Sequence, residues 1–145
     1  MRGTWLPSKV MTPLLIGQPG ACVLNVSSMS AFTPLTRIPG YSGAKAGVSN
    51  FTQWLATYLA RSGVRVNAIA PGFFMTEQNH ALQFNPDGTP TPRCAHIVDG
   101  TPMRRYGELK ELIGAMLFLV DERAASFVTG VVLPVDGGYS AFSGV

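Results

Sequence analysis

Short apolar runs at three places along the chain predict the strands of a sheet. Residues 21–26 and residues 64–70 each form such a run, with β-branched side chains in both. A third run covers residues 131–135. Runs of this length that are apolar on both faces are typical of parallel strands buried between two layers of helix.

Two amphipathic stretches separate these runs and predict helices. Residues 41–60 place apolar side chains at helical spacing and end near Ser62-Gly63, a common helix stop. Residues 108–120 form the second stretch. The side chains expected to face the core are Val48, Phe51, Leu55, Tyr58 and Leu59 in the first helix, and Leu109, Leu112, Ile113, Met116, Leu117 and Val120 in the second. The alternation of strand and helix predicts an α/β fold with about three parallel strands and right-handed crossovers.

The remaining segments show little periodicity. Residues 1–12 are expected to be the tail of a helix that Pro7 and Pro13 break, and Gln18-Pro19-Gly20 is expected to be a turn. Residues 73–102 contain several prolines and are predicted to be a long loop. A loop of that length in a compact domain is usually functional or mobile.

Composition indicates one globular domain, residues 1–145, and argues against several classes of function. The chain is 46% hydrophobic, enough for a core, and its net charge of +3 comes from scattered basic residues, so no nucleic-acid partner is expected. No apolar run approaches the ~20 residues of a membrane span, and the first residues lack a signal-peptide pattern. Cys22 and Cys94 fit reduced thiols and a cytoplasmic location. Cys94 and His96 alone are too few ligands for a metal site.

The residues that point to chemistry are Tyr41, Lys45 and Ser28. Tyr41 and Lys45 are four residues apart in a predicted helix, so they share one face. An ammonium group one helical turn from a phenol favours the phenolate, which lets a tyrosine exchange a proton with an alcohol or carbonyl oxygen. Ser28, at the end of an apolar run, is placed to hold that same oxygen by a hydrogen bond.

Four sequence blocks extend this pattern. They are Asn25-Val26-Ser27-Ser28, Tyr41-x-x-x-Lys45, Asn67-Ala68-Ile69-Ala70-Pro71-Gly72 followed by Thr76, and Thr129-Gly130 leading to Val135-Asp136-Gly137-Gly138. A Tyr-x-x-x-Lys pair alone is a weak signal, but four blocks in the right order and spacing are a strong one. Together they resemble the short-chain dehydrogenase/reductase family, over nearly the whole chain but only the C-terminal part of that family's fold.

The resemblance implies an oxidoreductase that transfers hydride between NAD or NADP and a secondary alcohol or ketone. It implies that Tyr41 is the general acid/base, that Lys45 assists it and touches the nicotinamide ribose, and that Ser28 orients the substrate oxygen. The residues it implies for cofactor binding are Tyr41, Lys45, Pro71, Gly72, Phe74 and Thr76. Asp136-Gly137-Gly138 is expected to be a structural turn.

A glycine-rich phosphate-binding motif between a strand and a helix is not found in the sequence. Relative to the family, the N-terminal half of the dinucleotide domain is absent, so a truncated, partial Rossmann-like doubly wound fold is predicted. NAD or NADP binding is therefore expected to be weakened or lost. The strand at residues 22–26 is also expected to lack its usual neighbour, and such an apolar edge favours a homo-oligomer.

The substrate class is suggested by three segments, residues 37–41, 73–79 and 138–145, which are similar to the mannonate/fructuronate-type sugar-acid reductases. A small-molecule substrate of that kind needs arginine or amide partners for its carboxylate. Gln78, Asn79 and Arg93 lie in the segment that closes over substrate in relatives, and they are the candidate substrate contacts.

Two other functions remain open. Ser42-Gly43-Ala44-Lys45 also matches the S-x-x-K motif of serine–lysine hydrolases, although the S-D-N and K-T-G partner motifs are not found. A cofactor-free remnant with weak esterase activity through Ser28 or Ser42 and Lys45 is the first alternative. The second is a non-catalytic assembly module, because relatives commonly pair through the helix before the Ser28 strand and the helix that carries Tyr41.

Overall fold

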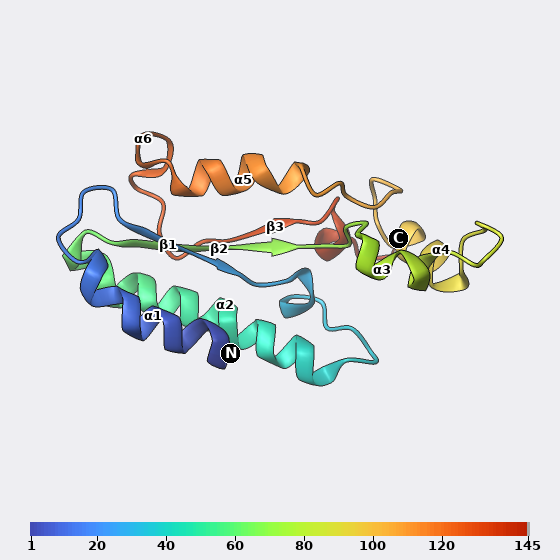
Figure 1. Ribbon diagram of the computed structural model, residues 1–145, viewed down its shortest axis with the longest axis horizontal. Helices are drawn as coiled ribbons and strands as arrows, with labels where there is room; N and C mark the ends of the chain where they lie inside the picture. The colour runs from blue at the N-terminus through green and yellow to red at the C-terminus, as the bar shows by residue number, and fades with distance from the viewer. Residues whose placement is uncertain (145) are drawn as a thin grey trace.

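The computed structural model describes residues 1–144 as a three-stranded parallel sheet with helices on both faces (Figure 1). The strands are β1 (Cys22–Val26), β2 (Arg65–Pro71) and β3 (Val132–Val135), in the spatial order β1-β2-β3. Each strand lies within one residue of its predicted run. The prediction of an α/β, partial Rossmann-like fold with parallel strands is confirmed.

Three helices form the layers that bury the sheet. Helices α1 (Arg2–Leu15) and α2 (Pro39–Leu59) cover one face, and α5 (Glu111–Val120) covers the other (Figure 1). β2 lies between its two neighbours and is buried from its first residue almost to its last. Within residues 1–144, no helix combines the length and the apolar character needed to cross a membrane. The shorter elements are the 3-10 turns η1 (Met29–Ala31), η2 (Ala60–Ser62) and η3 (Tyr139–Ala141), and the helices α3 (Glu77–Gln83), α4 (Pro92–Asp99) and α6 (Glu122–Ala125).

The core lies between α2 and the sheet, as the predicted helix over residues 41–60 requires. Phe51, Leu55 and Leu59 are buried there against the start of β2. The prediction that Tyr58 faces this core is wrong, because its side chain is 65% exposed and its ring stacks on Trp54 at a centroid distance of 5.1 Å. A tyrosine has an apolar ring and a polar tip, so helical spacing alone does not decide where it points.

Helix α1 runs through both of its prolines, contrary to the prediction that they break it. A proline removes one N–H donor from a helical turn, but its fixed φ is itself helical. Hydroxyl groups make additional bonds in these turns: Ser8 Oγ donates to the Thr4 carbonyl at 2.8 Å, and Thr12 Oγ1 donates to the Ser8 carbonyl at 2.7 Å. The Gln18-Pro19-Gly20 turn follows as predicted, with Gly20 at a positive φ of 68°.

The segment over residues 73–102 contains helices α3 and α4, so the prediction of a single long loop is wrong. Thr76 begins α3 with a reciprocal cap, in which its hydroxyl accepts from the Asn79 N–H at 3.2 Å and Asn79 Oδ1 accepts from the Thr76 N–H at 3.0 Å. Thr91 caps α4 by a single bond, accepting from the Cys94 N–H at 3.2 Å, and Pro92 takes the first helical position. Such caps stabilise helices that are too short to show a hydrophobic period.

Helix α5 begins three residues later than predicted, and most of its expected core face is exposed. Ile113 and Leu117 are more than half exposed, whereas Leu119, which was not predicted, is buried. Apolar side chains occupy almost every position from Leu112 to Val120, so the sequence carries no period that selects one face. The helix contacts all three strands, and its remaining apolar surface faces outward.

A buried arginine at the start of β2 joins the sheet to the C-terminus of α5. Arg65 is 8% exposed, and its guanidinium donates to the carbonyls of Leu119 at 2.8 Å, Val120 at 3.2 Å and Val128 at 3.4 Å. The last carbonyls of a helix have no partners inside the helix, and a cation near them also interacts favourably with the helix dipole. Arg65 therefore caps α5 from inside the domain.

Replacing Arg65 with methionine should lower the free energy of unfolding by about 2 kcal/mol, because three carbonyls lose a charged donor while the cost of burying the charge is relieved. Urea unfolding followed by circular dichroism measures this change. Arg61→Met is the matched control, because Arg61 is exposed on η2 and its loss should change stability by less than about 0.5 kcal/mol. Equal stability of the two variants would show that Arg65 does not hold α5 in place.

Candidate active site

Several of the candidate residues lie at the carboxyl ends of the strands, the edge where ligands bind in parallel α/β sheets. Ser28 follows β1, Gly72 follows β2 and Asp136 follows β3. Helix α2 packs against η1, the turn that contains the residues immediately after Ser28. The first turn of α2 carries Tyr41, so the fold brings the Ser28 segment and the Tyr41 segment to one end of the sheet.

Ser28 is a buried residue with defined hydrogen bonds. It is 7% exposed and forms the N-cap of η1. Its Oγ accepts from the backbone N–H of Ser30 at 3.2 Å and from the Ser30 hydroxyl at 3.1 Å. These bonds fix the Ser28 side chain without using its own hydrogen.

Lys45 connects α2 to the end of β1. Its Nζ donates to the Val26 carbonyl at 2.8 Å and lies 5.7 Å from the centre of the Tyr41 ring. Tyr41 is 47% exposed, so its ring is open to a ligand on one side. Because Val26 is only two residues before Ser28, the lysine lies beside both the tyrosine and the serine segment. The structure thus brings these predicted residues into one region, while their catalytic roles remain a prediction.

A second set of hydrogen bonds fixes the position of Lys45 relative to the end of β1. The Ser27 hydroxyl donates to the Lys45 carbonyl at 3.1 Å and lies 2.6 Å from the Ser49 hydroxyl. One turn further on, Asn25 Nδ2 donates to Thr52 Oγ1 at 2.9 Å. Helix α2 is therefore attached to β1 by polar side chains at successive turns, which limits sliding of Tyr41 and Lys45 relative to Ser28.

Gly72 marks a place where the ends of β2 and β3 touch. Its N–H donates to the Val135 carbonyl at 2.9 Å, and a Cβ at position 72 would lie 2.6 Å from the Asp136 backbone. Asp136 in turn accepts from the N–H groups of Gly138 and Ser140, each at 2.9 Å. The Asp136-Gly137-Gly138 segment is thus the structural turn that the sequence predicted, and only glycine fits opposite it.

The segment after Gly72 is held in place by backbone bonds to the loop before α5. Phe74 pairs with Gly107, and its ring occupies the space that a side chain at position 107 would need. Asn79 Nδ2 donates to the Phe74 carbonyl at 2.8 Å, and its Oδ1 is part of the α3 cap. Both ends of the Asn79 amide are therefore used to fix residues 74–79. Sequence reasoning assigned Asn79 to substrate and missed this structural use, although the Thr-x-x-Asn spacing is a capping signal.

The other predicted contacts are divided between the end of β2 and helices α3 and α4. Pro71 is the last residue of β2, and Thr76 is partly buried at the start of α3. Gln78 is exposed on α3 and Arg93 is exposed on α4, and these two helices pack against each other. Neither side chain lines a described cavity, so the structure does not bring them to the Tyr41 region.

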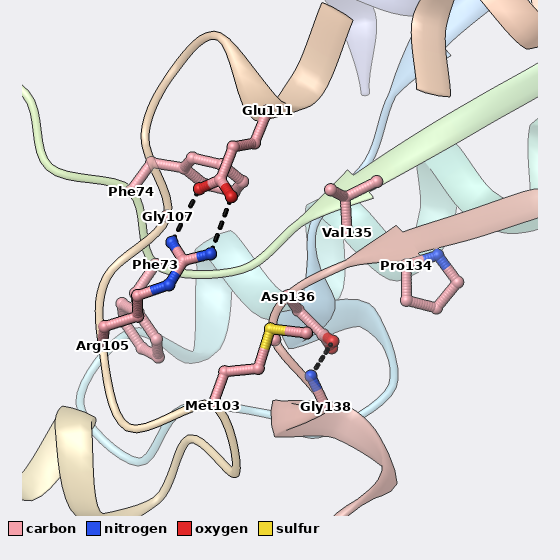
Figure 2. A pocket seen from close by; sticks show the side chains of 11 residues that line it. Phe73, Phe74, Met103, Arg105, Gly107, Glu111, Pro134, Val135, Asp136 and Gly138 are labelled. Atoms are coloured by element: carbon pink, nitrogen blue, oxygen red, sulfur yellow. Dashed lines mark hydrogen bonds and ion pairs between the residues drawn. The ribbon is translucent and has the colours of Figure 1, made fainter. Parts of the chain in front are cut away.

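A cavity of about 380 Å³, which the sequence did not indicate, lies between the ends of β2 and β3 and the loop before α5 (Figure 2). Arg105 closes one side of it by a two-bond pair with Glu111, with both N···O distances at 2.7 Å. The Arg105 bonds, followed by a bond from the Glu108 N–H, lower the pKa of the Glu111 carboxyl to about 2. The pair fixes the residues that lead into α5, and its two charges offset each other.

The Glu111 carboxylate should titrate near pH 2 in the folded protein, well below the ordinary value of 4.5. Because the folded state lowers this pKa, the stabilisation is complete above pH 4.5 and is lost as the pH falls toward 2. Carbon-detected NMR titration of the glutamate side chains measures the midpoint. In Arg105→Met the midpoint should rise toward the ordinary value, and Arg104→Met, which changes a neighbouring arginine paired with Asp99, should leave it unchanged. A wild-type midpoint near 4.5 would contradict the assigned pairing.

The part of the chain that the structure describes contains no cluster of side chains suited to binding a metal ion. Within residues 1–144 no group of three or more His, Cys, Asp or Glu side chains is arranged to hold an ion. Cys94 is buried at the start of α4, and His96 is exposed on the same helix.

The fold and the residues at its strand ends define a partial Rossmann-like α/β protein. A family model described as enoyl-(acyl carrier protein) reductase matches residues 1–140. An uncharacterized oxidoreductase of Haemophilus influenzae is 59% identical over 143 residues, which cover 99% of this chain and 50% of the relative. The chain belongs to the short-chain dehydrogenase/reductase family.

Solved structures give the same result. A proposed D-mannonate oxidoreductase from Haemophilus influenzae with bound NAD superposes with a TM-score of 0.95 at 59% identity, over 99% of this chain and 51% of that one. A gluconate 5-dehydrogenase from Burkholderia cenocepacia, in complex with NADP and tartrate, has a TM-score of 0.82 at 30% identity, over 98% of this chain and 53% of that one. The chain spans about half the length of the curated relatives it matches.

Proposed function

We propose that this chain carries the serine–tyrosine–lysine centre of a nicotinamide-dependent oxidoreductase that acts on a secondary alcohol or ketone. The observation that carries the proposal is the position of Lys45. Its ammonium donates to the Val26 carbonyl at the end of β1, two residues before Ser28. The same ammonium lies beside the Tyr41 ring. A cation held beside a phenol and near a fixed hydroxyl is the arrangement that proton exchange with a substrate oxygen requires.

In the proposed reaction Tyr41 exchanges a proton with the substrate oxygen. During alcohol oxidation the Tyr41 oxygen accepts the proton of the alcohol, and during ketone reduction the Tyr41 hydroxyl returns a proton to the same oxygen. Ser28 donates a hydrogen bond to that oxygen and holds the substrate carbon in place. Lys45 holds a positive charge beside the Tyr41 ring. The chemical step on carbon is hydride transfer, which a bound nicotinamide supplies or receives.

The residues present fit the nicotinamide end of such a cofactor. Lys45 has three N–H donors, and the bond to Val26 uses one of them, so two remain for ribose hydroxyl groups. The Thr76 hydroxyl accepts from Asn79 and keeps its own hydrogen for a carboxamide oxygen. We assign Pro71, Gly72 and the Phe74 backbone to the same nicotinamide end of the site. The choice between NAD and NADP is left open by relatives that bind one or the other.

A sugar acid is the substrate class that we propose. The relatives with bound cofactor include a proposed D-mannonate oxidoreductase and a gluconate 5-dehydrogenase, whose complex also contains tartrate. Arg93 and Gln78 are exposed polar groups on the paired helices α3 and α4, and they provide a cation and an amide for a carboxylate. Asn79 acts indirectly, since its amide holds the Phe74 backbone and the Thr76 cap.

The serine–lysine hydrolase alternative is not favoured by the position of Ser42. Its side chain is 5% exposed, and its Oγ accepts from the Leu35 N–H at 3.3 Å. A nucleophile has to reach a substrate carbon, whereas this hydroxyl is buried beneath the loop that precedes α2. The Lys45 ammonium is directed to Val26 instead.

Tyr41→Phe should lower the rate of D-mannonate oxidation with NAD by at least about 100-fold, because general acid/base catalysis typically contributes that much or more. The measurement is NADH absorbance, together with calorimetric titration of NADH and NADPH to determine cofactor binding. Tyr58→Phe is the matched control, since Tyr58 is an exposed tyrosine on the same helix and its rate should not change. Cofactor binding with equal rates for wild type and Tyr41→Phe would eliminate Tyr41 as the acid/base.

Assembly into a homo-oligomer is a second candidate function, favoured by the apolar surface of α1 and α2. Trp54 and Tyr58 are exposed and stacked on α2, and Val10 and Leu14 are exposed on α1. The two helices lie on the same side of the sheet (Figure 1). The side chain of Met1 approaches Gly47 of α2. An apolar surface shared by neighbouring helices is typical of a protein–protein interface.

Trp54→Asp should raise the dissociation constant of the self-associated protein by at least about tenfold, because an unpaired carboxylate would be buried in the interface. Sedimentation velocity over a range of concentrations measures it. Gln53→Asp places the same charge on the neighbouring exposed position of α2 and is the control. A wild type that sediments as a monomer at every concentration would refute assembly and leave the oxidoreductase proposal untouched.

A further inference from the structure

The Ser28 hydroxyl accepts two hydrogen bonds from one residue. The Ser30 N–H donates to it at 3.2 Å, and the Ser30 hydroxyl donates to it at 3.1 Å. Ser30 is 1% exposed, so no solvent competes for its hydroxyl. A serine hydroxyl has two acceptor positions and one hydrogen. Both acceptor positions of Ser28 are filled from within η1, and its hydrogen is the part left for a ligand.

We infer that Ser30 is a positioning residue that makes Ser28 act as a hydrogen-bond donor only. The inference rests on the proposed function and deepens it. A ketone oxygen and an alcohol oxygen both have lone pairs, so either one can accept from Ser28. A ligand that presents only a donor at this point, such as a protonated amine, finds no acceptor on Ser28 and is disfavoured.

Because Ser28 can only donate a hydrogen bond to the substrate, it cannot accept the proton that the substrate alcohol loses. In alcohol oxidation the substrate O–H has to be deprotonated while hydride leaves the carbon. Ser28 has no free lone pair to take that proton, so the proton passes to the Tyr41 oxygen. In ketone reduction the carbonyl oxygen gains negative charge as hydride arrives, and a donor already aimed at it strengthens its bond at that moment.

The same geometry argues against Ser28 as a nucleophile. Attack on an ester carbon needs an available lone pair on the oxygen and a base that removes its hydrogen. Both lone pairs are engaged by Ser30, and Lys45 donates to the Val26 carbonyl. Ser28 is therefore suited to polarising an oxygen rather than to forming a covalent intermediate.

Neutron diffraction from a deuterium-exchanged crystal of the chain tests the orientation directly. The Ser30 deuterium should lie on the line to Ser28 Oγ, and the Ser28 deuterium should point away from Ser30. A Ser28 deuterium on that line would overturn the inference. This result depends on no cofactor and no substrate.

Kinetics of Ser30→Ala tests the consequence. With the Ser30 hydroxyl removed, the Ser28 hydrogen is free to rotate, so kcat for ketone reduction should fall by about five- to tenfold with little change in KM. Ser8→Ala is the control: it removes a buried hydroxyl that donates one bond to a carbonyl within α1 and that has no part in the proposed site, so kcat should not change. An unchanged kcat in Ser30→Ala overturns the positioning role. If the wild type reduces no ketone with NADH or NADPH, the proposed function fails, and the neutron map alone decides the orientation.

Discussion

The hydrogen bond from Lys45 Nζ to the Val26 carbonyl is the interaction on which the candidate site depends. It joins a helix to the end of a strand at the point where the chain turns out of the sheet. The ammonium is held near Tyr41 because this bond and the Ser27 bond to the Lys45 carbonyl restrain both ends of the residue. Without them, a flexible lysine would spend much of its time in solvent, since ordering its side chain costs about 2 kcal/mol of conformational entropy.

The elements that sequence alone predicted well are those whose burial is simple. β2 is buried along almost its whole length and β1 is half-buried along most of its length, so continuous apolar sequence is enough to identify them. Helix α5 is different, because apolar residues at nearly every position hide the face that packs, and Leu119 rather than Ile113 is buried. Helices α3 and α4 were missed because caps at Thr76 and Thr91, not a hydrophobic period, define them.

The sequence predicted those parts of the candidate site that follow from the separation of residues along the chain. Tyr41 and Lys45 share a helix, so their proximity follows from four residues of separation. The bond from Asn79 to the Phe74 carbonyl forms only because the backbone turns into α3 at the Thr76 cap. The two bonds from Ser30 to Ser28 depend on the geometry of a single 3-10 turn. The cavity beside Arg105 is formed by segments far apart in the chain, and no local pattern encodes it.

The contact between Gly72 and Asp136 also determines which part of this molecule is able to move. It joins the ends of β2 and β3 so tightly that neither end shifts without the other. A few residues later, the pairing of Phe74 with Gly107 attaches the chain a second time. Any movement of α3 and α4 would therefore pivot beyond Phe74, while the joined ends of β2 and β3 stay in place.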